Sequence, residues 1–427
     1  MKRNWMLLIL TVVFLVGLTG NILAETITYL TPETDPTAVE VDKTIIERFE
    51  KMNPGVKVEL AHADLENLLP KLSAMLLAGT APDVAFCSPM YVPPLVEQEF
   101  LEPLDYLFID IGDIPKNMVT PNSENKIYDI PLAMESRPLY YRKDLFEEAG
   151  VKPPTTFDEW LEAARKLTVD TDGDGNIDQY GMTLRGMPPG NVGAFNAFLW
   201  SNNGDLIDEE GNVVIDSPEA IETLEFWGKM SKYCPPGVTN TSYHDMLVNF
   251  AQGTTAMAIA PGRLMANIDR YKPELRDKIG IVAPPVGPSG EKPAIWTPIN
   301  NFIVFKNGNE SLAKKFIEFY LSDEQYILFL TSAVPGHSLP TRQDWLDKDI
   351  YYSQETISKW EPIVKKSLKL AFDYSIDLML RYKGNQYIGR FMSDPTYSRE
   401  INMFLSGDKS AEEALNTVAE TWREMME

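Results

Sequence analysis

Five oxygen-bearing residues stand at alternate positions in the stretch DTDGDGNIDQYGM, and they have the spacing of a calcium loop. They are Asp170, Asp172, Asp174, Asn176 and Asp178, which match positions 1, 3, 5, 7 and 9 of such a loop. Gly175 takes the sixth position, where the loop turns sharply, but position 12 is Gly181 instead of a bidentate Glu. Because Asp and Gly also favour tight turns without any metal, weakly bound calcium and a metal-free surface turn both remain.

Residues for covalent catalysis are poorly represented. The three histidines, His62, His244 and His337, are far apart in the sequence, and no HExxH, GxSxG or GxxxxGK[ST] motif is present. A zinc enzyme or a hydrolase with a catalytic triad is therefore disfavoured. A glycoside hydrolase needs only two suitably spaced carboxylates, and with 62 acidic residues a chance pair is expected, so this class stays open.

The elements that would position these residues alternate between strands and helices. The β-rich run TITYL is followed by Val41, Ile45, Phe49 and Met52 at helical spacing, and then by the alternating run VKVEL. A second helical stripe, from Leu68 to Leu76, precedes the compact strand PDVAF. Strands joined by crossover helices predict a parallel sheet, and the fold class is therefore α/β.

Later helices are marked by their first residues. Thr156 and Glu159 form a capping box, in which each side chain accepts from a free backbone N–H of the other residue. Ser217-Pro218 predicts a second helix start, and Ser410 with Glu413 predicts another capping box. The α/β pattern thus continues to the end of the chain.

Charge and export signals exclude several classes of function. The formal net charge is -23, so nucleic acid is not an expected partner. Lys2 and Arg3 precede an apolar run that is too short to span a bilayer, and Ala24 closes it, which predicts a cleaved signal peptide over residues 1–24. We therefore expect a periplasmic or extracellular protein. Only Cys87 and Cys234 occur, and the sequence does not decide whether they pair.

Three segments, taken in this order, carry a likeness to a known family: LLAGTAPDVAFCSP, YDIPLAMESRPLYYRKDLFEEAGVKPPTTFDEWLEAARKLT and FAQGTTAMAIAPGRLMANID. They resemble the extracellular solute-binding proteins of bacterial ABC sugar importers, the maltose-binding-like group. This resemblance implies a periplasmic-binding-protein fold with two discontinuous α/β lobes, a hinge and a ligand cleft between the lobes. By analogy, one lobe comprises residues 25–134 and 286–340, and the other comprises residues 135–285 and 341–427.

The resemblance also implies which residues hold a sugar. Glu135 matches a position where the family commonly has an acid that accepts from sugar hydroxyls, and a structural hydrogen bond across the hinge is the alternative. Trp200 is expected to stack on a sugar ring, whereas Phe195 and Phe198 fit a buried helix face equally well. Arg263 stands where the family frequently has an aromatic contact, and this departure favours an acidic sugar.

Further cleft candidates lie at the lobe crossings and at the ends of parallel strands, where α/β proteins bind ligands. They are Glu33, Ser88, Trp296, Asn301 and Arg381, with Thr31, Cys87, Asn300 and Arg137 beside them. For Trp296 a buried position at the hinge is the alternative. Tyr141, at the end of the strand after Glu135, is expected to contribute to packing.

The predicted function follows from the resemblance. The protein is expected to be a monomer that captures a di- or oligosaccharide outside the cytoplasmic membrane and delivers it to the permease subunits of an ABC transporter. It needs no cofactor, although the aspartate loop leaves calcium open. One alternative is a binder of an acidic sugar or phosphorylated polyol, which requires Arg263 or Arg137 in the cleft. A secreted glycoside hydrolase is the alternative from another class.

Overall fold

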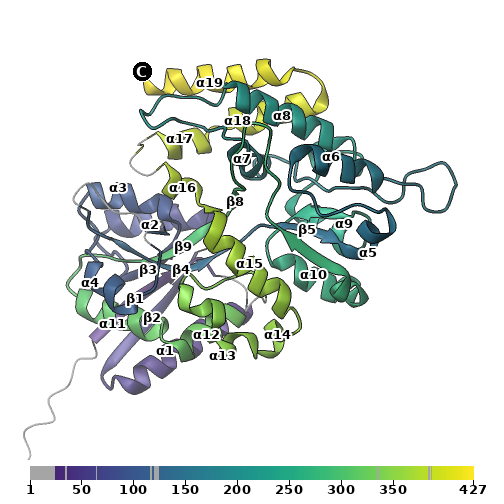
Figure 1. Ribbon diagram of the computed structural model, residues 1–427. Coiled ribbons are helices and arrows are strands. Elements are labelled where there is room, and N and C mark those ends of the chain that lie inside the picture. Colours follow the sequence, from purple (N-terminus) through teal and green to yellow (C-terminus); the bar gives the residue numbers. More distant parts are fainter. Residues whose placement is uncertain are drawn as a thin grey trace, which may run out of the picture.

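The computed structural model describes residues 25–427 except 34–35, 64, 116–117, 120–124, 333, 335, 383–384 and 386. The predicted signal segment 1–24 therefore lies outside the described residues. Within the described part, none of the helices combines the length and apolarity that a bilayer crossing needs. The chain forms two bodies, each built around its own sheet (Figure 1).

The first body contains a five-stranded sheet in the order β2-β1-β3-β9-β4. The central strand β1 (Glu25–Thr31) pairs in parallel with β2 (Val56–His62) and with β3 (Val84–Cys87), as the alternation of strands and helices predicted. Strand β9 (Ile299–Val304) returns from far along the chain and runs antiparallel to both β3 and β4 (Asp129–Met134). The sequence pattern alone did not predict this antiparallel strand.

Helices cover both faces of this sheet. They are α1 (Pro36–Met52), α2 (Leu65–Leu77), α3 (Val92–Glu97), α4 (Asp105–Ile111), α11 (Glu310–Tyr320) and α12 (Asp323–Ser332). The predicted stripe of α1 is buried at Ile45 and Phe49, and Phe49 packs edge-on against Phe316 of α11. The strands and helices predicted for this part of the chain are confirmed.

The second body is built on a three-stranded antiparallel sheet in the order β6-β5-β7. Its strands are β5 (Leu139–Arg142), β6 (Met257–Ile259) and β7 (Ile279–Val282). Its helices are α5 (Lys143–Glu148), α6 (Phe157–Lys166), α7 (Asn191–Ser201), α8 (Pro218–Ser231), α9 (Tyr243–Ala251), α10 (Arg263–Tyr271), α17 (Ile388–Ser393), α18 (Thr396–Ser406) and α19 (Ala411–Met426).

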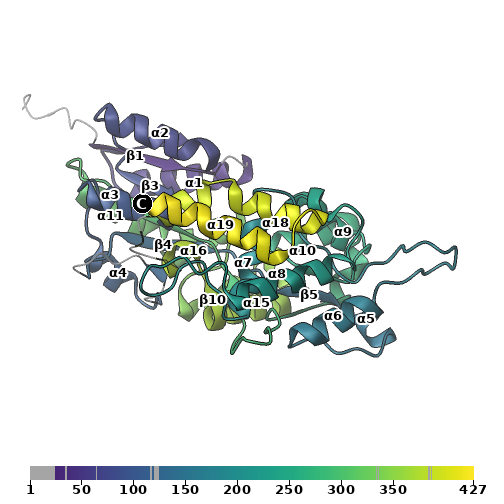
Figure 2. The same ribbon diagram turned by 90° about the horizontal axis from the view of Figure 1, so that it is seen from above.

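Aromatic side chains fill the core of the second body. Trp160 of α6 stacks on Phe198 of α7, with ring centroids 4.9 Å apart, and Trp227 and Trp422 are fully buried nearby. Both predicted capping boxes are present, at Thr156 before α6 and at Ser410 before α19, and Ser217 caps α8. Seen from above, α2 lies at one end of the molecule and α5 and α6 lie at the other (Figure 2).

Three chain crossings between the bodies lie side by side. The first links β4 to β5, the second passes through β8 (Ile295–Trp296) into β9, and the third follows β10 (Ser375–Ile376). The Glu135 N–H donates to the Pro298 carbonyl at 2.9 Å, and the Thr297 N–H donates to the Ile376 carbonyl at 3.0 Å. These bonds tie the crossings into a narrow strip that is suited to act as a hinge.

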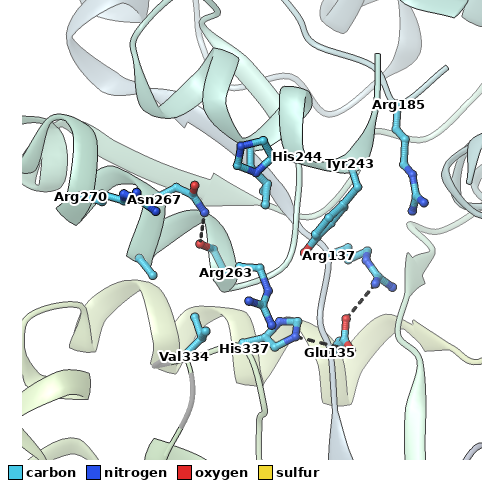
Figure 3. A pocket seen from close by; sticks show the side chains of 12 residues that line it. Glu135, Arg137, Arg185, Tyr243, His244, Arg263, Asn267, Arg270, Val334 and His337 are labelled. Atoms are coloured by element: carbon cyan, nitrogen blue, oxygen red, sulfur yellow. Dashed lines mark hydrogen bonds and ion pairs between the residues drawn. The ribbon is translucent and has the colours of Figure 1, made fainter. Parts of the chain in front are cut away.

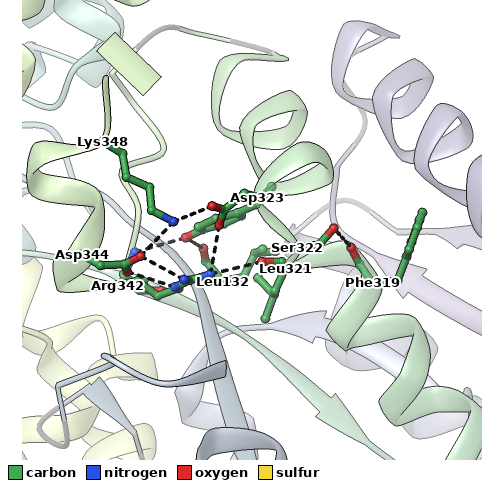
Figure 4. A network of polar contacts seen from close by, with 10 residues as sticks. Leu132, Phe319, Leu321, Ser322, Asp323, Arg342, Asp344 and Lys348 are labelled. Atoms are coloured by element: carbon green, nitrogen blue, oxygen red, sulfur yellow. Dashed lines mark hydrogen bonds and ion pairs between the residues drawn. The ribbon is translucent and has the colours of Figure 1, made fainter. Parts of the chain in front are cut away.

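The segment after residue 340 begins against the first body. Arg342 and Lys348 form ion pairs with Asp323 of α12 and with Asp344 (Figure 4). Trp345 packs edge-on against Tyr326 with ring centroids 4.9 Å apart. The resemblance places residues 341–427 in the second lobe, whereas these contacts attach the start of the segment to the first body. The lobe boundaries stay a prediction.

The chain then returns toward the second sheet. After α13 (Asp349–Tyr352) and α14 (Glu355–Ser358), the long helix α15 (Glu361–Tyr374) contacts both β7 and β8 and lies between the two bodies (Figure 1). The short helix α16 (Leu378–Arg381) follows the third crossing. The two bodies are thus joined by packed elements as well as by the crossings.

Candidate functional site

A cavity of about 650 Å³ lies where the crossings meet the second body (Figure 3). Its lining comes from the crossing after β4, from α9 and α10, and from the loop after α12. The lining residues are Glu135, Arg137, Arg185, Tyr243, His244, Leu247, Arg263, Ala266, Asn267, Arg270, Val334 and His337. We refer to this cavity as the pocket. Because it draws on both bodies, a molecule bound in it would contact both.

The floor of the pocket is formed by the first crossing. Glu135 and Arg137 form an ion pair in which Nη2 of Arg137 lies 2.8 Å from Oε2 of Glu135. The guanidinium of Arg137 also lies flat over the ring of Trp296, 4.0 Å from its centroid, which is a cation–π contact. Trp296 in turn presses against Gly193 of α7, where any side chain would collide with its ring. These contacts fix the Glu135 carboxylate at the floor.

The charge state of Glu135 is set by its neighbours. Burial raises the pKa of this carboxyl, but the positive groups around it outweigh burial, and the net pKa lies below its usual value. His337 contributes most when it is protonated, with Nε2 3.7 Å from Oε1 of Glu135, and Arg137 and Arg263, which are always charged, follow. Glu135 is therefore ionised and can accept hydrogen bonds.

His337 is held mainly in its neutral form. Burial lowers the pKa of this imidazole, the carboxylate of Glu135 raises it, and Arg263 and Arg137 lower it again, with a net shift downward. Its Nδ1 atom is buried and has no hydrogen-bond partner among the described residues. His337 therefore presents a free ring nitrogen that a ligand can satisfy.

Two helices begin at the pocket. Ser242 and Asp245 form a capping box that starts α9, so that Tyr243 and His244 are its first two residues. Helix α10 starts at Arg263, directly after Gly262. A Cβ atom at Gly262 would lie 1.8 Å from the carbonyl oxygen of Gly336, so only glycine allows these two bodies to approach this closely.

Arg185 closes one side of the pocket beside Tyr243 (Figure 3). Its guanidinium lies 5.4 Å from the centroid of the Tyr243 ring. Burial lowers the pKa of Arg185, and the positive charge of Arg137 lowers it further. Burial also raises the pKa of the Tyr243 hydroxyl, and the carboxylate of Glu135 adds to this shift. Tyr243 therefore keeps its proton and can donate it in a hydrogen bond.

Four of the residues singled out from the sequence meet here. Glu135, Arg137 and Arg263 line the pocket, and Trp296 supports its floor through Arg137. Their ligand roles remain predictions that this geometry favours. Tyr141 packs against Phe146 with ring centroids 5.0 Å apart, in agreement with the packing role expected for it.

Trp200 and Arg381 lie elsewhere. Trp200 is only 5% exposed in α7, and its indole N–H donates to the Tyr382 hydroxyl at 3.1 Å. Arg381 is paired with Asp205 and lines a separate cavity of about 740 Å³ whose other charged lining residues are acidic. Neither residue lines the pocket. Phe195 and Phe198 belong to the core, because they are 0% and 2% exposed.

The candidates at strand ends are used in local structure. Ser88 accepts a hydrogen bond from the Met90 N–H at the start of a short 3₁₀ turn, and the Glu33 carbonyl bonds to the His62 ring at 3.0 Å. Asn301 is fully buried in β9, where its amide donates to Asp129. None of the three lines the pocket. Cys87 and Cys234 are both buried and unpaired with each other.

Six lining residues with polar side chains were not singled out as ligand contacts from the sequence. They are Arg185, Tyr243, His244, Asn267, Arg270 and His337. Asn267 and Arg270 lie four and seven residues after Arg263, so the face of α10 that contains Arg263 could have identified them. The others come from distant segments and show no local pattern that marks them.

The aspartate loop lies on the surface at the end of α6. Ligand oxygens of Asp170, Asp172 and Asp174 lie within 4.8 Å of one another. The Asp170 carboxylate also accepts from the backbone N–H groups of Gly173 at 2.6 Å and Gly175 at 2.8 Å. Both glycines have positive φ, as this turn requires. The loop is thus a self-bonded turn, and calcium binding by it stays a hypothesis.

Comparisons with known proteins agree with this architecture. The profile of a family described as bacterial extracellular solute-binding protein matches residues 35–327. A putative binding protein of Brucella abortus is 27% identical over 346 residues, which are 79% of this chain and 80% of that protein. The maltodextrin-binding protein MdxE of Bacillus subtilis is 26% identical over 319 residues, which are 72% of this chain and 73% of that protein.

A solved structure shares the whole fold. The maltose-bound MalE3 of Thermotoga maritima superimposes with a TM-score of 0.72 at 24% sequence identity. The match covers 94% of this chain and 100% of that one. The fold is therefore the two-lobed periplasmic-binding-protein fold that the sequence predicted, and the two bodies are its lobes.

Proposed function

The chain belongs to the bacterial extracellular solute-binding proteins of the maltose-binding type, which serve ABC sugar importers, and we propose that it captures a carbohydrate in the pocket and delivers it to a membrane permease. Relatives named for their ligands support a carbohydrate: besides the maltodextrin-binding protein, they include a mannitol-binding protein of Pseudomonas aeruginosa and an arabinooligosaccharide-binding protein of Halalkalibacterium halodurans. These relatives are binding proteins rather than enzymes.

One observation carries the proposal: the pocket lies between the lobes, beside the strip of crossings. A ligand that contacts Glu135 at the crossing and Arg263 on α10 binds the closed arrangement better than the open one, and it therefore shifts the population toward closure. Glu135 accepts from hydroxyl groups, and Asn267 and Tyr243 can donate to them. The permease then recognises the closed conformation of the protein.

Closure can be tested at the contact between Gly262 and Gly336. The substitution Gly262→Ala adds a methyl group where the Gly336 carbonyl oxygen would be 1.8 Å away, so the lobes cannot approach each other this closely at that point. The backbone at Gly262 has φ -55°, which alanine adopts freely, and each lobe should keep its fold. We expect small-angle scattering to show an open shape that no sugar closes, and calorimetry to show an affinity at least about 100-fold weaker.

A matched control is Gly389→Ala, a substitution in α17 of the second lobe, where a Cβ atom has no neighbour within 4 Å and the backbone φ is not positive. This variant should bind and close like the native protein. The proposal of capture by closure is contradicted if Gly262→Ala binds sugar with native affinity. A glycoside hydrolase would instead convert a saccharide into product, which chromatography of the incubated sugar detects.

A further inference from the structure

The pocket walls are strongly basic in a protein that is acidic overall. Four arginines and one carboxylate line it, whereas the whole chain has 62 acidic and 39 basic residues. The four are Arg137, Arg185, Arg263 and Arg270. Because acidic residues outnumber basic residues in the chain, a surface of average composition would be acidic. The charge of the pocket therefore requires an explanation of its own.

Most of the described arginines outside the pocket have carboxylate partners, and Arg390, which donates to the Met425 carbonyl, is an exception. Arg142 lies 2.7 Å from Asp144, and Arg276 lies 2.7 Å from Asp269. In the pocket, Arg137 alone is matched, by Glu135. In the part of the chain that the structure describes, the side chains of Arg185, Arg263 and Arg270 form no ion pair. Among the described residues, the protein thus leaves positive charge without an ion-pair partner at a place where its two lobes meet.

Polar atoms of the pocket are also shielded from water. The Nη1 atom of Arg137 and the Nδ1 atom of His337 are both buried, and neither has a hydrogen-bond partner among the described residues. The Arg137 N–H is a buried donor without an acceptor, which is costly, and a ligand that supplies an acceptor removes that cost. The downward pKa shift of Arg185, caused by burial and by Arg137, indicates the same mutual repulsion among the cations.

The two helices that begin at the pocket add to the positive potential. The first turns of α9 and α10 contribute Tyr243, His244 and Arg263 to its lining. Free backbone N–H groups give the start of a helix a partial positive charge, which favours anions nearby. Helix ends and arginine side chains therefore act in the same direction.

The positive surface extends along the pocket. Arg263 and Arg270 are seven residues apart on the same face of α10, which corresponds to about 10 Å along the helix axis. Asn267 lies between them and can bind hydroxyl groups. An extended basic surface suits acidic groups on successive sugar units better than one terminal anion.

We infer that the ligand is an acidic carbohydrate whose carboxylate groups contact Arg263 and Arg185, while Glu135 and Asn267 bind its hydroxyls. This inference rests on the proposed function, because it names the class of carbohydrate that the same pocket takes. Arginine holds a carboxylate through two parallel, charge-assisted N–H donors, and the hydroxyls of a neutral sugar accept from the same donors more weakly. A phosphorylated sugar offers the same acceptor chemistry, and the experiment separates the two sources.

The experiment measures melting temperature and calorimetric affinity of the native chain with matched probes. Digalacturonate is compared with neutral galactobiose, glucuronate with glucose, and glucose 6-phosphate with both. Acetate and inorganic phosphate serve as bare anions. We expect digalacturonate to bind at least about 100-fold more tightly than galactobiose, and its affinity to fall as salt is raised from 50 to 300 mM. Glucose 6-phosphate should bind more weakly than digalacturonate.

The variants Arg263→Gln and Arg185→Gln should each weaken acid binding by about 10- to 100-fold, because each removes a charge-assisted contact. Their effect on galactobiose should be small. Arg165→Gln is the control: it makes the same charge change on α6, where Arg165 is exposed and paired with Glu162. It should bind like the native chain. Melting temperatures of all three ligand-free proteins report whether the fold is kept.

The outcomes separate the two claims. If galactobiose or glucose binds as tightly as its acidic counterpart, the acidic ligand is refuted while capture of a carbohydrate stands. If the phosphorylated sugar binds best, phosphate and not carboxylate is the group recognised. If no neutral or acidic saccharide raises the melting temperature or closes the lobes, the proposed function fails, and the inference fails with it.

Discussion

The pocket and the aspartate loop both concentrate charge of one sign, but they differ in how the protein deals with it. In the loop, Asp170 and Asp174 accept hydrogen bonds from the backbone of their own turn, and Asp174 is exposed while Asp170 is partly exposed. In the pocket, Arg137 and His337 keep buried nitrogen atoms without hydrogen-bond partners in the described chain. A charge cluster whose polar atoms lack hydrogen-bond partners thus indicates a ligand site. A cluster whose polar atoms are satisfied by the neighbouring backbone indicates a structural turn.

In a third region, the ion-pair network after residue 340, cations and anions are present in equal number. Arg342 and Lys348 face Asp323 and Asp344, so that two cations meet two anions (Figure 4). Arg342 binds Asp344 through two donors, at 3.1 Å and 3.0 Å. This network holds the segment after residue 340 against α12 and needs no further partner. The pocket has the same residue types in an unbalanced ratio.

The largest effect on ligand affinity is expected from a substitution that removes the ion pair at the floor of the pocket. Arg137→Met removes the ion pair with Glu135 and the contact over Trp296. It leaves a buried carboxylate with His337 3.7 Å away as its nearest remaining partner. Because the Glu135 carboxylate then loses the guanidinium that holds it in place, ligand affinity should fall by about 100-fold, which corresponds to about 2.7 kcal/mol. Calorimetry measures this loss.

The control for this variant is the double change Arg137→Met with Glu135→Gln, which removes both charges at once. It should be more stable than Arg137→Met, because no unpaired carboxylate is left in the floor. Native affinity in Arg137→Met would show that the ligand does not depend on this pair, and the pocket would then lose its assignment.

The next effect concerns stability rather than binding. Arg342→Met leaves Asp323 and Asp344 with Lys348 as their remaining ion-pair partner in the network. Because the arginine is largely buried but both acids are partly solvated, we expect a loss of about 1–3 kcal/mol in the free energy of unfolding. Urea denaturation measures it. Ligand affinity should be unchanged, and a parallel loss of binding would mean that the network supports the pocket.

How far the sequence could lead differs between these regions. The helix starts at Thr156 and Ser410 were predictable, because a capping box is complete within four residues. Glu135 and Arg263 could be proposed because they match positions of a family motif. His337 and Arg185 could not, since only the folded chain brings them to Glu135 and Tyr243 across long sequence separations.

Trp200 shows the opposite error. Its polar neighbours Ser201, Asn202 and Asn203 suggested an exposed position in the cleft. In the structure α7 is apolar on nearly all sides and buried, and the polar neighbours hydrogen-bond inward: Asn202 donates to the Glu219 carbonyl at 3.0 Å. A polar side chain whose partner lies far along the sequence resembles an exposed one until the fold is known.

A smaller effect is expected from pH. Burial, with smaller downward contributions from Arg263 and Arg137, lowers the pKa of His337 in the ligand-free protein. Its neutral form therefore contributes stability that is present above about pH 6.5 and is lost as the pH falls through the lowered value. An anionic ligand raises this pKa, so affinity should increase on acidification, by at most about tenfold for each unit of that rise.

Calorimetry at pH 7.5, 6.5 and 5.5 tests this prediction, with uptake of protons on binding as the second readout. His337→Gln cannot titrate and should flatten the dependence of affinity on pH. If the variant keeps the native pH profile, another group is responsible. A neutral ligand should show the reverse trend or none, which ties this measurement to the charge of the ligand.

The smallest effect is expected at the loop. The position of the missing bidentate ligand is Gly181, and a Cβ atom there would lie 2.1 Å from the carbonyl oxygen of Ala164, so no side chain fits. The loop therefore cannot complete a calcium site from its own sequence. At 1 mM calcium the gain in stability should be on the order of 0.1 kcal/mol or less, and a chelator should leave the melting temperature within about 1 °C.

Asp170→Asn sharpens the comparison, because it removes the charge and keeps one side-chain oxygen that can accept from Gly173, while the bond from the Gly175 N–H is lost. We expect this variant to lose some stability by the same amount with and without calcium, since the loss comes from the turn and not from a metal site. A chelator that lowers the native melting temperature by several degrees, with no effect on Asp170→Asn, would instead show a complete metal site. In that event a cluster whose hydrogen-bonding groups are satisfied within the chain would also bind a ligand. Unsatisfied hydrogen-bonding groups would then no longer distinguish the pocket from the loop.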